Sequence, residues 1–236
     1  MKISIADGAT VTLDGVNITN LGNNCDWAGI NCPGDATIIL KDCSTNTVCA
    51  GRDSYGDSNY PGIWIAPDKK LTIKGGGQLT AYSNNTNPYG AGIGGGYEIA
   101  CGDIEIQGGD INATGGEWAA GIGCGYVADC GTITITGGTV TATGGFGAAG
   151  IGSGYDEASC GAITISGGTV TANGGDGGAG IGSGYAEASC GAITITTGVT
   201  QVTATKGEDA PNSIGAGNGS SCGTVTIEPG ANVTQN

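Results

Sequence analysis

One stretch of about thirty residues recurs along this chain and limits what it can fold into. The clearest copies read AGIGCGYVADCGTITITGGTVTATGG from Ala120, AGIGSGYDEASCGAITISGGTVTANGG from Ala149 and AGIGSGYAEASCGAITITTGVTQVTAT from Ala179. A single isoleucine position can be followed through these copies and the weaker ones, at Ile3, Ile30, Ile63, Ile93, Ile122, Ile151, Ile181 and Ile214. Self-similarity at a period of this length is typical of solenoids. The anchors therefore predict about eight coils, each of about 29–33 residues.

Each copy contains three short strand-like pieces and nothing with a helical period. In the copy from Ala149 these pieces are 149–152, 162–166 and 169–173. Ile163 and Ile165 alternate with small or polar residues, which is the period of a half-buried strand. Three strands per repeat predict an all-β fold, a parallel β-helix (β-solenoid) in which Ile163 lies between Ile133 and Ile193. Its coils should be right-handed, because parallel crossovers almost always are.

The repeats divide the chain unevenly, although we expect residues 1–236 to form a single β-helix domain. Residues 1–89 read as irregular N-terminal coils with loop insertions, 90–205 as regular repeats and 206–236 as a C-terminal coil. Such a solenoid builds its core from stacked Ile, Val, Ala and Thr rows. The scarcity of large side chains, with 1 Phe, 1 Met and 3 Trp, therefore does not prevent folding.

The charge balance limits the classes of partner that the chain can bind. Seven basic residues against 21 acidic ones give a net charge of −14. This disfavours nucleic acid and anionic membranes, both of which bind through Lys and Arg. No apolar run approaches the length of a membrane span, so we expect no membrane insertion. The chain has no histidine, the commonest general acid–base and metal ligand.

The repeat motif also resembles a known group of proteins. The segments GAGIGSGY from Gly178 and CGAITISGGTVTANGG from Cys160 are similar to Gly-rich β-helix repeats in large secreted and surface proteins of bacteria. Many of those proteins are described as adhesin-like or carbohydrate-binding, and their fold is pectate-lyase-like. The resemblance covers Gly29 to Ile227. It implies an extracellular or cell-surface location, with the signal peptide absent from this sequence. It transfers no catalytic residue.

Threonine rows are the first candidate site. Their side chains are expected to project outward on two neighbouring sides of the coil, where they could bind a sugar or ice, or simply suit exposed strands. Charged neighbours such as Glu105 and Asp110 interrupt the rows. The predicted ligand-binding residues are Thr132, Thr134, Thr136, Thr139, Thr141, Thr143, Thr164, Thr169, Thr171, Asn173, Thr194, Thr196, Thr203 and Thr205.

Tyrosine forms a second candidate site, because one tyrosine follows a glycine in each of four successive copies. Tyr97, Tyr126, Tyr155 and Tyr185 predict a ladder of rings. The ladder could stack against sugar rings, or its members could stack on one another and cover an apolar edge.

Ten cysteines are present, and five of them recur at one position of the repeat. Cys101, Cys130, Cys160, Cys190 and Cys222 predict an inward ladder of thiols, which we interpret as small buried apolar groups. Cys25, Cys32, Cys43 and Cys49 fall in irregular segments. There, Cys25–Cys32 and Cys43–Cys49 disulfides would be plausible in a secreted protein.

Carboxylates supply the only enzyme-like features. Asp53 and Asp57, with Arg52, Tyr55 and Tyr60, lie in a non-repeating loop over 51–60. Asp103, Glu105 and Asp110 are the residues that we would assign to a glycoside hydrolase or polysaccharide lyase. An acidic stripe between the Tyr and Cys positions could hold structural calcium; its members are Glu98, Asp129, Asp156, Glu157 and Glu187.

These observations favour a noncatalytic binding or scaffold module that needs no cofactor and no metal. We expect it to present flat Thr- and Asn-rich faces to a glycan or a host or cell surface. The alternatives are an ice-binding protein and a β-helix polysaccharide lyase or glycoside hydrolase. Solenoid ends expose strand edges, so end-to-end or edge self-association is also expected.

Overall fold

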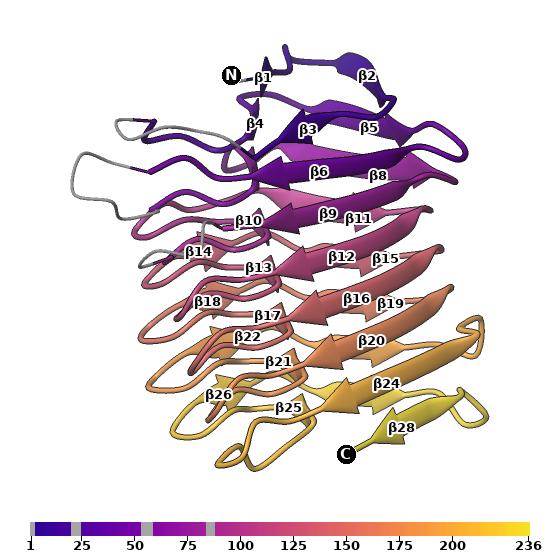
Figure 1. Cartoon of the computed structure of the whole chain (residues 1–236). Helices are drawn as coiled ribbons and strands as arrows, with labels where there is room; N and C mark the ends of the chain where they lie inside the picture. Colours follow the sequence, from indigo (N-terminus) through magenta and orange to yellow (C-terminus); the bar gives the residue numbers. More distant parts are fainter. Residues whose placement is uncertain (1–2, 20–24, 53–58, 84–87) are drawn as a thin grey trace.

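Strands of two to six residues stack on their counterparts in the next coil, because every coil repeats the same alternation of apolar and polar side chains. The computed structural model describes residues 3–19, 25–52, 59–83 and 88–236. It shows a right-handed parallel β-solenoid whose rungs run from the N-terminus to the C-terminus along one axis (Figure 1). The predicted fold class is confirmed.

Three sheets of eight strands form the sides of the solenoid. Sheet A contains β1 (Ile3–Ser4), β4 (Ile30–Cys32), β7 (Ile63–Ile65), β10 (Ile93–Gly94), β13 (Ile122–Gly123), β17 (Ile151–Gly152), β21 (Ile181–Gly182) and β25 (Ile214–Gly215). Sheet B contains β2 (Ala9–Leu13), β5 (Ala36–Leu40), β8 (Lys70–Gly75), β11 (Asp103–Ile106), β15 (Ile133–Ile135), β19 (Ile163–Ile165), β23 (Ile193–Ile195) and β27 (Val225–Ile227). Sheet C contains β3 (Asn17–Ile18), β6 (Thr45–Cys49), β9 (Gln78–Tyr82), β12 (Asp110–Thr114), β16 (Thr139–Thr143), β20 (Thr169–Asn173), β24 (Gln201–Thr205) and β28 (Val233–Gln235).

A fourth, smaller sheet was not predicted. Sheet D contains β14 (Asp129–Cys130), β18 (Ser159–Cys160), β22 (Ser189–Cys190) and β26 (Ser221–Cys222). The later coils therefore have four strands where the sequence predicted three. Two-residue strands are too short to show an alternation of apolar and polar residues, which is why the sequence pattern missed them.

The isoleucine register is as predicted. Sheet A pairs the anchor isoleucines with one another from Ile3 to Ile214, so seven turns separate its first and last strands. In sheet B, Ile163 pairs with Ile133 on one side and Ile193 on the other, and its side chain is fully buried. One hydrophobic cluster runs from Ile5 to Ile214. Burying one such isoleucine contributes about 1.5–3 kcal/mol.

A column of glycines lies next to the anchor isoleucines in sheet A. Its φ angles lie between +129° and +139°, in a region that L side chains rarely adopt, and its members are Gly94, Gly123, Gly152, Gly182 and Gly215. A Cβ atom on Gly152 would lie 1.8 Å from the carbonyl oxygen of Gly182. That oxygen accepts a hydrogen bond from the backbone N–H of Ser153. Adjacent rungs therefore pack this closely only because a side chain is absent.

Candidate functional site

The outer face of sheet C carries a column of uncharged polar side chains in register. Figure 1 shows the strands of this sheet stacked side by side along the solenoid. The column continues through every rung, with a Thr or an Asn at each position. Its members are Asn17, Thr47, Thr80, Asn112, Thr141, Thr171, Thr203 and Thr234. We call these eight residues the central column.

Two further columns flank the central one and are also mostly uncharged. One contains Thr45, Gln78, Asp110, Thr139, Thr169 and Gln201. The other contains Cys49, Tyr82, Thr114, Thr143, Asn173 and Thr205. Among the described strands of sheet C, Asp110 is the single charged residue, and it accepts a 3.2 Å hydrogen bond from the amide of Gln78. The face is therefore flat, polar and nearly neutral in a strongly acidic chain.

The hydroxyls of the central column are available to a ligand. Thr141, Thr171 and Thr203 are half-exposed, and Asn112 is exposed. Within the part of the chain that the structure describes, the side chains of these three threonines make no hydrogen bond to the protein. In a parallel sheet, neighbouring members of such a column lie about 4.8 Å apart. The column therefore offers one donor–acceptor group at each step of that spacing.

The predicted threonines of sheet B form a different face. Thr134, Thr164 and Thr194 continue a column with Thr10, Thr37, Thr72 and Thr226, which Glu105 interrupts. The structure thus divides the fourteen predicted residues between two faces. Those of sheet B and its strand ends are Thr132, Thr134, Thr136, Thr164, Thr194 and Thr196, and those of sheet C are Thr139, Thr141, Thr143, Thr169, Thr171, Asn173, Thr203 and Thr205.

Several polar groups on the sheet B face already bond to the protein. The backbone N–H and the hydroxyl of Thr132 donate to one carboxylate oxygen of Asp103, at 2.7 and 2.9 Å. The ammonium group of Lys70 lies 2.7 Å from Glu105, and its hydrogen bond lowers the pKa of that carboxyl. This face is therefore more charged and more internally bonded than the face of sheet C.

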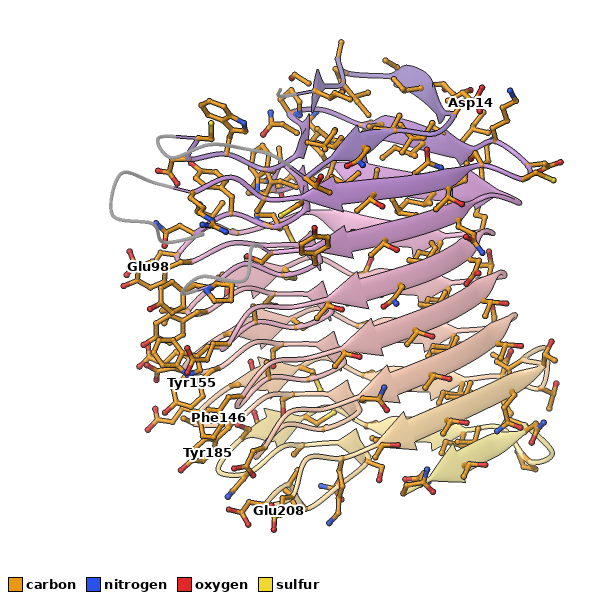
Figure 2. The ribbon with its side chains drawn as sticks, in the orientation of Figure 1. Asp14, Glu98, Phe146, Tyr155, Tyr185 and Glu208 are labelled. Atoms are coloured by element: carbon orange, nitrogen blue, oxygen red, sulfur yellow. The ribbon has the colours of Figure 1, made fainter. Side chains whose placement is uncertain are left out.

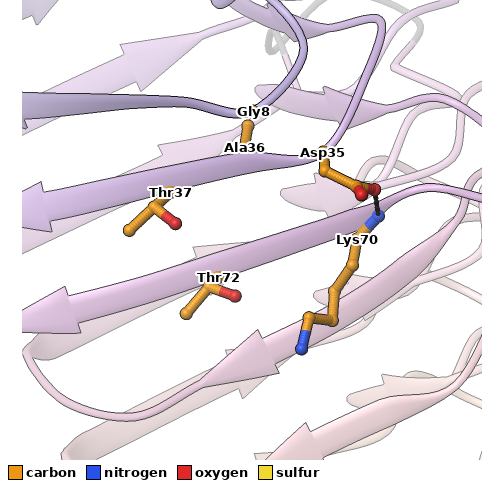
Figure 3. A pocket seen from close by; sticks show the side chains of 6 residues that line it. All are labelled: Gly8, Asp35, Ala36, Thr37, Lys70 and Thr72. Carbon is orange, nitrogen blue, oxygen red and sulfur yellow. Dashed lines mark hydrogen bonds between the residues drawn. The ribbon is translucent and has the colours of Figure 1, made fainter.

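In a pocket at the N-terminal end of the sheet B face, charged groups also already bond to the protein. Gly8, Asp35, Ala36, Thr37, Lys70 and Thr72 line it (Figure 3). The Asp35 carboxylate accepts a 2.9 Å hydrogen bond from the backbone N–H of Lys70, and the Lys70 ammonium group pairs with Glu105. These interactions join neighbouring rungs, and no pair of carboxylates converges in the pocket.

Aromatic rings form a ridge along loops that follow the strands of sheets C and A. The predicted ladder is confirmed, because Tyr97 stacks on Tyr126 with centroids 5.2 Å apart, and Tyr155 lies 5.9 Å from Tyr126 and 5.5 Å from Tyr185. Two rings that the sequence analysis missed join it, since Tyr89 and Trp118 stack at 5.1 Å. We call these six residues the aromatic ridge. Its rings contact one another, as the structural interpretation predicted.

Phe146, which is not one of these six residues, and Tyr97 of the ridge keep apolar surface in solvent. Figure 2 shows Tyr155, Phe146 and Tyr185 on the same side of the solenoid as Glu98. The side chain of Phe146 is 50 % exposed, and Tyr97 is 36 % exposed. Further along the chain, Gly147 occupies the position that Trp118 has one coil earlier. A Cβ atom there would lie 2.3 Å from the ring of Tyr155, so the glycine makes room for that ring.

Residues that directly follow the ladder tyrosines adopt a left-handed backbone conformation although they are not glycine. Glu98, Asp156 and Ala186 have φ angles of +52°, +59° and +58°. Such conformations cost about 1 kcal/mol or more and occur mainly where the surrounding structure imposes them. Burial and the neighbouring Asp156 raise the pKa of Tyr126. The acidic residues are therefore held beside the rings.

The carboxylates do not assemble into a catalytic or metal centre in the described residues. Asp103 and Glu105 lie on sheet B, whereas Asp110 begins a strand of sheet C, so the three do not face one another. No group of three or more potential metal ligands occurs in the described part of the chain, including the predicted acidic stripe. Asp53, Tyr55 and Asp57 of the non-repeating loop lie outside the described residues.

The cysteine ladder is confirmed. Cys101, Cys130, Cys160, Cys190 and Cys222 pair in register on successive rungs. All ten thiols are free. The proposed Cys43–Cys49 disulfide is wrong, because β6 separates the two residues by most of an extended five-residue strand, beyond the Cα distance that a disulfide spans. Cys25 and Cys32 are also unpaired, and Cys32 is part of the hydrophobic core.

The last rung is less covered than those before it. Val225 is 39 % exposed, and Ile227 and Val233 are half-buried, whereas Ile163 and Ile193 are fully buried. End-to-end association through this surface remains a prediction. No helix in the described residues is long and apolar enough to cross a membrane.

A comparison with protein families agrees with this geometry. Four stretches match a model of the beta helix repeat, at residues 71–97, 104–126, 133–155 and 163–185. These four stretches of the solenoid are therefore beta helix repeats. No curated protein and no solved structure matches it.

The four matched beta helix repeats follow the same path through the solenoid. Each begins at an inward residue of sheet B, passes through sheets C and A and ends at a tyrosine of the ladder. The first, for example, runs from Leu71 to Tyr97. Both the central column and the aromatic ridge therefore belong to the repeating part of the molecule.

Proposed function

We propose that this β-helix repeat protein is a noncatalytic module that binds an extended neutral polysaccharide along the outer face of sheet C. The observation that carries the proposal is the central column, in which Thr or Asn recurs in register on all eight rungs. A linear polymer of sugar units can repeat the same hydroxyl contact from rung to rung. The low charge of the face suits a neutral glycan, whereas the net charge of −14 disfavours a polyanion.

The aromatic ridge supports the same interpretation. Loops that carry Trp118 and Phe146 begin directly after β12 and β16, so the ridge borders the face of sheet C. Aromatic rings pack against the C–H faces of sugars, and the exposed side chain of Phe146 offers such a surface. A rigid module of this kind fits a role in an extracellular or cell-surface adhesin, as the resemblance of the repeat motif implies.

One pair of variants on a single rung tests the proposal. Thr141→Lys places a long cation in the middle of the sheet C face, and Thr134→Lys makes the same change on the sheet B face of the same coil. Both residues are half-exposed, so both variants should fold. The readout is binding of the purified protein to a glycan array and to insoluble neutral polysaccharides. We expect Thr141→Lys to abolish binding and Thr134→Lys to retain it.

Other results would contradict the assignment. Binding that survives Thr141→Lys would exclude the sheet C face. Binding that is lost equally in both variants, with unchanged circular dichroism, would show an effect of charge that is independent of the face. A third variant, Tyr155→Ala, measures the contribution of the aromatic ridge, and we expect it to weaken binding rather than abolish it.

Ice is the second candidate ligand, because the central column is regular and contains no charged residue. Ice presents repeating water positions to a flat surface, and hydroxyls at a constant spacing could join that arrangement. Thermal hysteresis of the same protein and the same two lysine variants tests this function. Hysteresis that disappears in Thr141→Lys, together with a blank glycan array, would replace the polysaccharide by ice.

A further inference from the structure

Sulfur atoms lie unusually close together along sheet D. The Sγ atoms of Cys101 and Cys130 are 3.0 Å apart, and those of Cys190 and Cys222 are 2.6 Å apart. Both distances are shorter than an ordinary non-bonded contact between two sulfur atoms. Adjacent strands also bring the Cα atoms of each pair to about 4.8 Å, within the range that disulfides tolerate.

The two pairs leave one member of the ladder without a ladder partner. Cys160 lies between them in the register, and the thiol of Cys124, a buried residue outside the ladder, contacts those of both Cys130 and Cys160. The Sγ distances therefore single out two cross-rung pairs, and Cys124 contacts Cys130 of the first pair as well as Cys160. This grouping distinguishes the ladder from an evenly spaced row of inert thiols.

Both cross-rung pairs can be reached from outside. Cys101 and Cys130 line an open pocket together with Asp68, Asp103 and Asp129. Cys222 is half-buried, on a rung whose Val225 is 39 % exposed. The Cys190 thiol donates a hydrogen bond to the Cys222 sulfur, which lowers the pKa of Cys222 although partial burial opposes this effect. The thiolate is the attacking form in disulfide exchange.

We propose that the cysteine ladder is a disulfide site in which Cys101–Cys130 and Cys190–Cys222 form two bonds between adjacent rungs in an oxidising environment. In the second pair, the Cys222 thiolate attacks one sulfur of an external disulfide and releases one thiolate. The Cys190 thiolate then attacks the Cys222 sulfur of this mixed disulfide and releases the second. Two electrons pass to the external disulfide, which leaves as two thiols that carry the two protons. The Cys101–Cys130 bond forms by the same exchange.

The Cys190–Cys222 bond would tie the last rung to the one before it. That rung stacks on a neighbour through β25, β26, β27 and β28, and its apolar residues are only partly covered. Each rung of a solenoid contacts only its neighbours, so a partly covered rung opens more readily than a fully covered one. A covalent link at this point therefore opposes local opening of the rung.

Peptide mapping after oxidation tests the proposal. The protein is the full chain with Cys43→Ser, which removes an exposed thiol that would join two molecules. The oxidant is cystamine, a small cationic disulfide that the aspartates of the pocket attract. After remaining thiols are blocked at low pH, mass spectrometry should identify the Cys101–Cys130 and Cys190–Cys222 links. Amide hydrogen exchange of β27 should slow by at least about tenfold on oxidation.

Two variants give the controls. Cys222→Ser should lose the slowing of exchange at β27 while it keeps the Cys101–Cys130 link, and Cys124→Ser should keep both links. Ladder thiols that stay reduced in the folded protein would overturn the proposal. A different pairing, such as Cys130–Cys160, would overturn it as well. So would links that appear only after the circular dichroism of the native sheet is lost.

Discussion

The glycine column of sheet A provides the sharpest test of how the rungs stack. Gly152→Ala and Gly215→Ala make the same chemical change in the same column, at φ angles of +135° and +129°. A Cβ atom at residue 152 would lie 1.8 Å from the Gly182 carbonyl oxygen, whereas at residue 215 the nearest atoms are 3.6 Å away. The two variants therefore share the cost of the backbone conformation and differ in the contact with the next rung.

The magnitudes follow from these contacts. A non-glycine residue at such a φ angle costs about 1–2 kcal/mol, and this is the full expected cost of Gly215→Ala. In Gly152→Ala the next rung must also move by more than an ångström, which breaks the bond from the Ser153 N–H to the Gly182 carbonyl. A buried donor and acceptor left without partners cost about 1–3 kcal/mol each. The free energy of unfolding should therefore fall by about 3–8 kcal/mol in Gly152→Ala.

Thermal and denaturant unfolding, followed by far-ultraviolet circular dichroism, measures this difference. For a chain of this length, a gap of about 3 kcal/mol corresponds to melting temperatures about 6–12 °C apart. Equal losses in the two variants would show that backbone conformation alone determines the cost. A Gly152→Ala protein as stable as the parent would refute the close approach of the rungs.

Three further predictions concern the core, a loop and an ion pair. Ile163→Ala should lower the free energy of unfolding by about 2–5 kcal/mol, because the side chain is fully buried between two other isoleucines. Urea unfolding measures this loss. Ala186→Gly should raise the melting temperature slightly, because glycine adopts the φ angle of +58° without strain. Glycine also raises the conformational entropy of the unfolded chain, which offsets part of this gain. A clear fall in the calorimetric melting temperature would contradict the prediction. The Lys70 hydrogen bond lowers the folded-state pKa of Glu105, so its stabilisation is present above the unfolded pKa of about 4.3 and is lost as the pH falls through the folded value. The free energy of unfolding of Glu105→Gln should therefore fall less between pH 7 and pH 3 than that of the parent, by a difference below about 1 kcal/mol because Lys70 is 54 % exposed. Urea unfolding at the two pH values measures this difference, and an equal fall in both proteins would show that the pair does not contribute.

The sequence predicted the fold well because the same side chains recur at the same place in every coil. Ile163 could be assigned its two neighbours from spacing alone, and the tyrosine and cysteine ladders could be placed in the same way. The fourth sheet was missed because a two-residue strand such as Ser159–Cys160 has no alternation to detect.

The sites were less predictable where they depend on residues that do not repeat. Tyr89 and Trp118 are replaced by glycine in the following coils, so no ladder marks them in the sequence. Cys124 approaches Cys160 only in three dimensions. The predicted threonine rows begin only at Thr132, because irregular insertions hide the alignment of Thr47 and Thr80 with Thr141.

Because neighbouring coils are nearly identical, the number of coils in this molecule can change while the fold stays the same. Removal of residues 149–178 would join Ala148 to Ala179, an equivalent junction, and would place β21 on β13 with isoleucine opposite isoleucine. Each of the three long sheets would lose one strand, and the remaining register would be unchanged. Unequal recombination between such repeats can therefore shorten or extend the outer face of sheet C in whole-coil steps while the register of the surviving strands is kept.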